Sequence, residues 1–511
     1  MEPAHNAFDH IVVGAGSAGC VIARRLVDAG RKVLLIETGG RDDNPAIHDP
    51  GRSWELWNSP EDYAYFTEPQ QHADGTQVFW PRGKVLGGSS ALNGMIYVRG
   101  HRSDYDDWAT RHGATGWSYD EVLPYFTRSE DFEDGQSRYH GAKGPLPVTR
   151  NHAPNPVTTA FMEACEQYGI PYNDDCNADE ILGVNLLHRT ILDGKRISAW
   201  TAFVLPVLDS PLLTVMTGAP VTRVIVEGGR ARGVEVIRNG SADTFRCSDD
   251  VILSGGTIGS AQLLLLTGIG PAGDLSELGI GVVADLPGVG ANLHDHALVP
   301  VVWESAQPVP PGSANKLEAQ YFAKTDPAMP APDLQPLMSH VPLPVAGYDV
   351  PEEGHGYTVL AGTIRPLSRG RLWLRSSDPA QAPALDPRYY AEPSDLEAMV
   401  TAVKQVREIG AQKALAEWGT LEVAPGPGVV TDAEIATYAK RALISYHHQV
   451  GTCRMGTDPD AVVDPRLRVH GIAGLRVADA SVMPTVTSGN THAPTVMIGE
   501  RCAEFVLEES S

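Results

Sequence analysis

A glycine-rich turn close to the start of the chain constrains the fold more than any other feature. Gly14, Gly16 and Gly19 form the pattern G-x-G-x-x-G between an apolar, β-branched stretch over residues 11–13 and a helical pattern over residues 17–29. In a β-α-β unit the first glycine allows a tight turn, the second lets the backbone approach a pyrophosphate, and the third lets helix and strand pack closely. The pattern therefore predicts a β-α-β unit, a parallel sheet, and a dinucleotide bound by Gly14, Gly16, Ser17, Ala18 and Gly19.

An acidic residue supports the same interpretation. Glu37 follows a second short apolar stretch over residues 33–36 and lies eighteen residues after Gly19. A carboxylate in this place accepts hydrogen bonds from the adenosine ribose and repels a 2′-phosphate. The residues thus favour NAD or FAD over NADP and leave the choice between the first two open.

Length and charge limit the architecture and the partners. A chain of 511 residues exceeds what one hydrophobic core usually holds, so we expect two domains. The formal net charge of −23 repels phosphate backbones, and this excludes a general nucleic-acid-binding role.

The cysteines and the N-terminal residues bear on location. The six cysteines form no C-x-x-C pair, which is typical of reduced thiols in the cytoplasm. Residues 1–10 lack the basic and apolar regions of a signal peptide, and no apolar run approaches the ~20 residues that a membrane span needs. We therefore expect a cytoplasmic protein without a membrane span.

The rest of the chain alternates between strand, helix and proline-rich patterns. Strands are expected over residues 221–226, 233–237 and 250–253, and helices over residues 396–412, 432–442 and 493–507. Prolines at positions 308, 310, 311, 327, 330, 332 and 336 predict a long loop or lid over residues 304–345. The alternation over residues 357–374 predicts antiparallel strands with one solvated face.

Four longer segments resemble the glucose–methanol–choline (GMC) family of FAD oxidoreductases. They are Gly83–Gly94 (GKVLGGSSALNG), Ser254–Leu264 (SGGTIGSAQLL) with Thr267–Pro271, Leu286–His296 (LPGVGANLHDH) and Leu475–Pro484 (LRVADASVMP). The resemblance runs from about residue 9 to residue 507 and is greatest to the choline oxidase and choline dehydrogenase branch. It implies FAD as the cofactor.

The resemblance also implies an architecture. We expect an α/β fold, α+β overall, in which a Rossmann-type FAD-binding domain is assembled from residues 1–155, 210–300 and 450–511. Residues 156–209 and 301–449 are expected to form a substrate-binding domain with an antiparallel sheet flanked by helices. Beyond the glycine-rich turn and Glu37, the expected FAD contacts are Arg82, Gly83, Gly87, Gly88, Ser89, Asn93, Gly94, Val221, Asp479, Ala480 and His492.

One departure from relatives concerns the attachment of the cofactor. Some family members link the flavin covalently to a histidine just before the residue that matches Asn93. This chain has Leu92 in that place, so we expect non-covalent FAD.

Two histidines are the catalytic candidates. By resemblance, the segment around His448 carries the first active-site histidine of the family, and His492 matches the second position. An imidazole titrates near neutral pH and can remove the hydroxyl proton of an alcohol while hydride leaves its carbon for flavin N5. We expect His448 to be the base and His492 to donate a hydrogen bond to the developing alkoxide. The two roles remain interchangeable, and His447 is interpreted as a neighbour that shapes the pocket.

Other functions and substrates remain open in the sequence. The same scaffold serves a hydroxynitrile-lyase-like enzyme, a photodecarboxylase-like enzyme or an FAD-binding protein without catalysis. Choline oxidases carry a glutamate two residues after the Asp-His that matches Asp295-His296, and here that residue is Leu298. We therefore expect an uncharged primary alcohol as substrate, with oxygen or another acceptor reoxidising the flavin.

His294, Asp295 and His296 lack a further partner at metal-ligand spacing, so no metal is expected. The oligomeric state cannot be inferred from the sequence.

Overall fold

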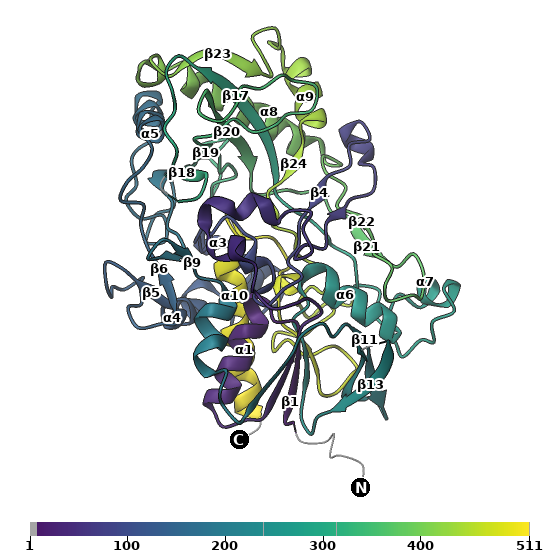
Figure 1. Ribbon diagram of the computed structural model, residues 1–511. Helices are drawn as coiled ribbons and strands as arrows, with labels where there is room; N and C mark the ends of the chain where they lie inside the picture. Colours follow the sequence, from purple (N-terminus) through teal and green to yellow (C-terminus); the bar gives the residue numbers. More distant parts are fainter. Residues whose placement is uncertain (1–7, 239, 313, 510–511) are drawn as a thin grey trace.

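The glycine-rich turn follows the first strand of a five-stranded parallel sheet. The computed structural model describes residues 8–238, 240–312 and 314–509. The strand order is β10-β2-β1-β14-β25, and every neighbouring pair is parallel. The strands are β1 (His10–Val13), β2 (Val33–Ile36), β10 (Leu213–Met216), β14 (Val251–Leu253) and β25 (Leu475–Val477). The predicted β-α-β unit is confirmed, because α1 (Ser17–Asp28) connects β1 to β2 (Figure 1).

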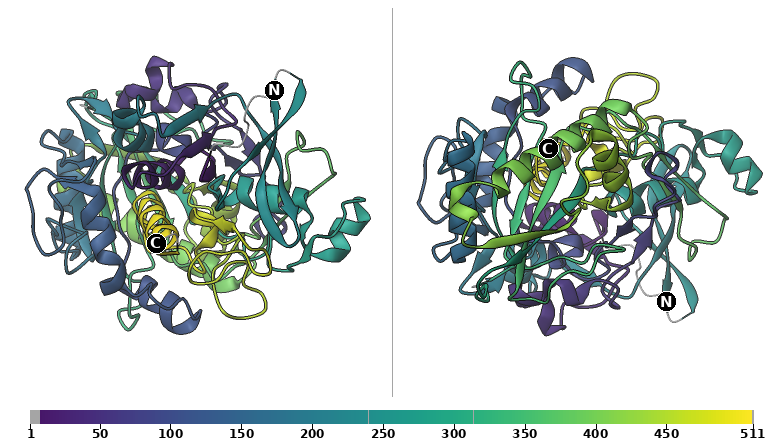
Figure 2. Two further views of the ribbon diagram at one scale, coloured as in Figure 1. Left: turned by 90° about the horizontal axis from the view of Figure 1, so that it is seen from below. Right: turned by 90° about the horizontal axis from the view of Figure 1, so that it is seen from above.

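The first and last helices of the chain lie side by side. Helix α10 (His492–Glu509) runs along α1 (Figure 2), so the helix expected over residues 493–507 is confirmed. A Cβ added at Gly499 would lie 2.8 Å from the carbonyl oxygen of Ala18, which shows how closely the two backbones approach. Buried Glu500 on α10 also pairs with Arg25 on α1 at 2.7 Å. This packing brings residue 492 next to residue 17.

A three-stranded antiparallel sheet flanks the parallel one. It contains β11 (Val221–Glu227), β12 (Arg230–Arg238) and β13 (Ser241–Arg246), and α6 (Gly256–Thr267) packs against β11. The strands expected over residues 221–226, 233–237 and 250–253 coincide with β11, β12 and β14.

The second main layer is a seven-stranded antiparallel sheet in the upper part of Figure 1. Its order is β23-β17-β20-β19-β18-β7, and β24 pairs with β17. Helix α8 (Pro393–Gly410) packs on β20 and β17 and contacts α5 (Pro156–Tyr168) and α9 (Asp432–Arg441). The strands are β7 (Gly183–Leu186), β17 (Ala297–Ser305), β18 (Leu317–Phe322), β19 (Leu337–Ser339), β20 (Gly356–Thr363), β23 (Gly419–Ala424) and β24 (Ile444–Ser445).

The proline-rich segment is not the continuous loop that the sequence suggested. It contains the end of β17 and two whole strands, β18 and β19. Its prolines lie between strands, at positions 308, 310 and 311 before β18, at 327, 330, 332 and 336 before β19, and at 342 and 344 after β19. Proline is tolerated in connections because no ladder hydrogen bond is lost there. The prediction of a structureless lid over residues 304–345 was therefore wrong.

The solvated face expected over residues 357–374 is also wrong for most of that range. Strand β20 does pair antiparallel with β17 and β19, but all eight of its residues are buried. Helix α8 packs against this strand, and its Leu360 lines an internal cavity. The alternation of exposed and buried residues persists only in β21 (Arg371–Trp373), which pairs with β22 (Ala384–Asp386).

The remaining elements are short or peripheral. They are α2 (Pro45–His48), α3 (Arg102–Arg111), α4 (Tyr119–Ser129), α7 (Ala272–Glu277), β3 (Tyr65–Phe66), β4 (Phe79–Trp80), β5 (Glu130–Phe132), β6 (Leu146–Val148), β8 (Ile191–Leu192), β9 (Lys195–Arg196), β15 (Ile269–Gly270) and β16 (Ala284–Asp285). Within the described ranges, no helix combines the length and apolarity needed to cross a bilayer. The exact domain boundaries given above stay a prediction.

Candidate active site

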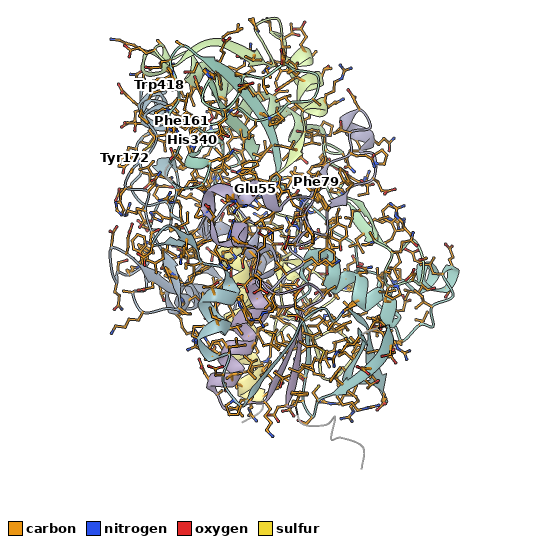
Figure 3. All side chains as sticks on the ribbon, viewed as in Figure 1. Glu55, Phe79, Phe161, Tyr172, His340 and Trp418 are labelled. Carbon is orange, nitrogen blue, oxygen red and sulfur yellow. The ribbon has the colours of Figure 1, made fainter. Side chains whose placement is uncertain are left out.

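A cavity of about 820 Å³ is lined by residues of both main sheets. Val13, Ile36 and Leu253, at the carboxyl ends of β1, β2 and β14, line one part of it. Ligands of parallel α/β sheets bind outside these strand ends. The opposite wall comes from the antiparallel sheet and from residues 53–82, whose Phe79 lies between the two sheets in Figure 3.

The glycine-rich turn opens onto this cavity. Gly14, Gly16, Ser17 and Ala18 line it, and the N-cap Gly16 of α1 supplies no side chain to the first backbone N–H groups of the helix. A helix N-terminus of this kind is suited to a phosphate. Gly19 does not line the cavity, but a Cβ there would lie 1.9 Å from the Gly14 carbonyl oxygen. The third glycine thus serves helix–strand packing.

Glu37 places a carboxylate at the same end of the cavity. Its Oε2 accepts a hydrogen bond from the backbone N–H of Ala15 (3.0 Å), and its Oε1 accepts one from Gly39 (2.8 Å). Burial raises the pKa of Glu37 to about 7. The side chain is thereby fixed beside the glycine-rich turn, where it can meet a ribose hydroxyl.

The loop over residues 82–94 lies across the start of α1. A Cβ at Gly88 would fall 2.7 Å from the Cα of Gly16, so the two backbones are in direct contact. Gly87 does not line the cavity; its N–H donates to the carbonyl oxygen of Ala15 at 2.8 Å. Leu92 does line the cavity and has no atom that could bond to a flavin. This fits non-covalent FAD.

Asp479 binds the start of α6 at the cofactor end of the cavity. Its Oδ2 accepts hydrogen bonds from the backbone N–H of Gly256 (2.9 Å) and from the hydroxyl of Ser260 (2.6 Å). The cavity walls contain fifteen of the seventeen predicted cofactor residues: Gly14, Gly16, Ser17, Ala18, Glu37, Arg82, Gly83, Gly88, Ser89, Asn93, Gly94, Val221, Asp479, Ala480 and His492. The helix N-terminus, the glycine contacts and the fixed carboxylate suit FAD, although each individual contact stays a prediction.

His448 lies where the cavity meets the antiparallel sheet. Its Nδ1 is 2.9 Å from the Nδ1 of His296, and its Nε2 is 3.1 Å from the Nδ2 of Asn490. The ring stacks on Tyr446 with 4.6 Å between ring centroids. Burial, together with the neighbouring His296, lowers the pKa of His448 well below its ordinary value. The imidazole is therefore neutral at physiological pH.

His492 has different contacts from those of His448. Its Nδ1 is 3.0 Å from the hydroxyl of Ser17, and its Nε2 is buried without a hydrogen-bond partner among the described protein atoms. Burial lowers the pKa of His492 to about 4. Both histidines line the cavity, but the residue that contacts the Nε2 of His448 is Asn490, two positions before His492. The sequence reasoning missed Asn490; the only signal was a polar side chain just before a helix that begins at the site.

A buried aspartate holds the loop that carries His448. Asp295 accepts hydrogen bonds from the His448 backbone N–H (2.8 Å), the Gln449 side-chain amide (2.9 Å) and the hydroxyls of Ser445 and Tyr389. The sequence had drawn attention to Asp295 as part of a family-like segment and as a weak metal candidate. Its contacts show that it positions the His448 loop, and among the described residues no group of three His, Cys, Asp or Glu side chains could hold a metal ion.

His447 contributes to the wall beside His448. Its φ of +66° places it in the left-handed region, and Arg82 donates a hydrogen bond to its carbonyl oxygen at 2.6 Å. Trp57 meets its ring edge-on with 5.1 Å between centroids. The strained turn directs the two adjacent imidazoles differently, which agrees with a pocket-shaping role for His447.

Comparisons with known proteins agree with this site. Models of the GMC oxidoreductase family match residues 8–298 and 366–499. The chain is 41% identical to the mitochondrial choline dehydrogenase of Homo sapiens over 98% of this chain and 89% of that protein. The structure of pyridoxine 4-oxidase from Mesorbium loti is similar with a TM-score of 0.94 and 35% identity, covering 97% of this chain and 98% of that one. A fungal aryl-alcohol oxidase is similar with a TM-score of 0.86 and 25% identity over 99% of each chain.

These relatives favour alcohol oxidation over the lyase-like and decarboxylase-like alternatives. The family model over the first half of the chain covers the glycine-rich turn and the loop over residues 82–94, and the second model covers His448 and His492. The chain belongs to the GMC oxidoreductase family and is an FAD-dependent enzyme that oxidises the CH–OH group of an alcohol.

Proposed function

We propose that the enzyme oxidises an uncharged, largely apolar primary alcohol to its aldehyde, with His448 as the base. The observation that carries this proposal is a neutral imidazole beside an apolar wall. Leu298, Leu337, Leu343 and Leu360 all line the cavity that His448 faces. Such a wall favours hydrocarbon over a permanent charge.

The acidic side chains of the cavity support the same substrate class. Glu37 and Asp479 are the two acidic residues in its described lining, and both are bound by backbone N–H groups at the cofactor end. A quaternary ammonium needs an anionic or aromatic environment. Aromatic side chains do line the cavity, among them Trp54, Trp57 and Tyr446, so it is the lack of an acidic side chain beside His448 in the described lining that disfavours choline. We therefore propose that choline, the substrate named for the human relative, is a poor substrate here.

In the proposed reaction His448 accepts the hydroxyl proton at Nε2. FAD, when bound, supplies the acceptor for the hydride that leaves the alcohol carbon. The Asn490 amide and the free Nε2 of His492 are the available groups for a hydrogen bond to the developing alkoxide. His492 keeps this predicted role, and Asn490 joins it because it contacts His448 directly. The cytoplasmic location and the identity of the electron acceptor also stay predictions.

The pH profile of flavin reduction tests the state of the base. Burial depresses the folded-state pKa of His448, so the neutral form persists as the pH falls through the ordinary imidazole value of about 6.5. We expect a reduction rate that is flat from about pH 9 to about pH 5.5. The free energy of unfolding has a different pH dependence. As the pH falls, histidines of the unfolded chain are protonated before those buried in the folded chain, so the free energy of unfolding is largest above about pH 6.5 and decreases below it. A stopped-flow pH jump separates the two effects, and a rate that halves at about pH 6.5 before unfolding would contradict the account.

Leu298→Glu tests the substrate class. A carboxylate on this wall should attract a quaternary ammonium and repel hydrocarbon, so the ratio of kcat/KM for choline over an apolar alcohol should rise at least about tenfold, or about 1.4 kcal/mol. Leu298→Gln has a similar size and no charge, and it should not favour choline. If both variants behaved alike, charge at position 298 would not control the substrate class.

The proposal itself is tested by a panel of alcohols mixed with the oxidised holoenzyme under anaerobic conditions. Benzyl alcohol and medium-chain aliphatic alcohols should reduce the flavin faster than choline does. Faster reduction by choline would overturn the proposed substrate class but leave alcohol oxidation intact. Admitting air afterwards shows whether oxygen serves as the electron acceptor.

A further inference from the structure

A row of buried amide side chains leads from the antiparallel sheet to His448. We call Asn185, Gln320, Gln335 and Asn490 the amide row. Asn185 on β7 and Gln320 on β18 face each other across neighbouring strands, Gln335 lies just before β19, and Asn490 precedes α10. Asn185, Gln320 and Gln335 are at most 1% exposed. Buried amides of this kind are costly unless they hydrogen-bond, so their mutual orientation has energetic weight.

The hydrogen bonds of the row have one direction. The Nε2 of Gln320 donates to the Oδ1 of Asn185 at 3.1 Å. The Nε2 of Gln335 donates both to the Oε1 of Gln320 at 2.8 Å and to the Oδ1 of Asn490 at 2.9 Å. Because the oxygen of Asn490 is occupied by Gln335, its Nδ2 is the group that faces the Nε2 of His448.

This direction determines where His448 carries its proton. A side-chain NH₂ can only donate, so the Nε2 of His448 must present its lone pair to Asn490. The neutral ring then carries its proton on Nδ1, which lies 2.9 Å from the Nδ1 of His296 and donates to it. Burial lowers the pKa of His296 to about 3, so that ring is neutral and can accept.

We infer that Gln335 is a positioning residue that keeps the Nε2 of His448 unprotonated by holding Asn490 with its NH₂ toward the imidazole. The inference rests on the proposed role of His448 as the base. If all the amides were reversed, the oxygen of Asn490 would face His448 and require an N–H there. Nε2 could then no longer accept the proton of the alcohol.

Gln335→Glu and Gln320→Glu form a matched pair of tests, since each introduces one carboxylate into the same row. An ionised carboxylate at position 335 can only accept, so Asn490 must turn its NH₂ away from His448. We expect flavin reduction by alcohol in the holoenzyme to fall about 10²-fold or more, the lower part of the range for losing a general base. An ionised carboxylate at position 320 accepts from Gln335 as the amide oxygen of Gln320 does, so the orientation is kept and the rate should stay near that of the wild-type enzyme.

Two readouts separate positioning from damage to the fold. The Gln335→Glu variant should regain rate as the pH is lowered and its new carboxylate is protonated, because the acid can donate to Asn490. In addition, ¹⁵N NMR of histidine-labelled holoenzyme should show His448 as the Nδ1–H tautomer in the wild type and in Gln320→Glu, and as the Nε2–H tautomer in Gln335→Glu. FAD content and thermal unfolding serve as controls for the fold.

The results that would overturn the inference are equally specific. A wild-type His448 with its proton on Nε2 would overturn it directly. So would equal rates for the two variants from about pH 6 to about pH 10, a range that spans the pKa values of buried glutamates. Failure of the proposed base role looks different, since His448 variants would then reduce flavin normally while the tautomers still followed Gln335.

Discussion

His448→Gln is expected to slow flavin reduction by alcohol about 10²–10⁴-fold, because a positioned general base contributes that much to a proton transfer. Glutamine is close to histidine in size and can still hydrogen-bond to Asn490, which His448 contacts at 3.1 Å. What it lacks is a basic lone pair. The measurement is anaerobic stopped-flow absorbance at saturating alcohol, with FAD content checked in the same preparation.

His447→Gln is the matched control for that prediction. It removes the adjacent imidazole from the same strained turn and the same cavity wall. We expect a much smaller loss of rate, because the hydrogen bonds to His296 and Asn490 belong to His448. Equal losses in the two variants, or a normal rate in His448→Gln, would remove His448 from the role of base.

The second large effect concerns FAD binding and Gly88. The residue has a φ of +53°, and a Cβ there would lie 2.7 Å from the Cα of Gly16. For Gly88→Ala, overpacking costs about 1–3 kcal/mol and left-handed backbone about 1–2 kcal/mol. Together they should lower FAD affinity on the order of 10²-fold. We expect the variant to be purified with little FAD. The measurements are the ratio of flavin to protein after gel filtration and the Kd for FAD from a fluorescence titration.

Gly259→Ala provides the comparison for Gly88→Ala. Gly259 also lines the cavity, but a Cβ there meets nothing within 4 Å and its φ is not positive. This variant should keep its FAD. If Gly88→Ala bound FAD as tightly as Gly259→Ala, the close approach of the loop to α1 would have no part in binding the cofactor.

Local patterns with strong physical constraints were predictable from the sequence. Strands β1 and β2 with helix α1 were expected because the glycines that open α1 and the β-branched strands leave few other conformations. Helices α8, α9 and α10 were expected because their apolar periodicity matches the face that each one buries. The FAD contacts were predicted from long, specific motifs, and most of the predicted residues line one cavity.

The misses came from interactions between distant parts of the chain. Prolines 308 to 336 suggested a lid because a sequence does not show that they lie between strands rather than inside them. The full burial of β20 depends on α8, which begins thirty residues after that strand ends. Asn490 and Asp295 gain their importance from partners 42 and 153 residues away. No local pattern contains that information.

The central claim is that an alcohol gives its hydride to the flavin of this enzyme, and single-turnover mixing under anaerobic conditions tests it most directly. Oxidised wild-type enzyme is mixed with an apolar primary alcohol or with the same alcohol deuterated at the carbinol carbon. The account predicts that the flavin band at about 450 nm bleaches, that aldehyde forms in equal amount, and that deuterium slows both. Conversion of substrate with the flavin band unchanged, or no bleaching by any alcohol, would contradict it.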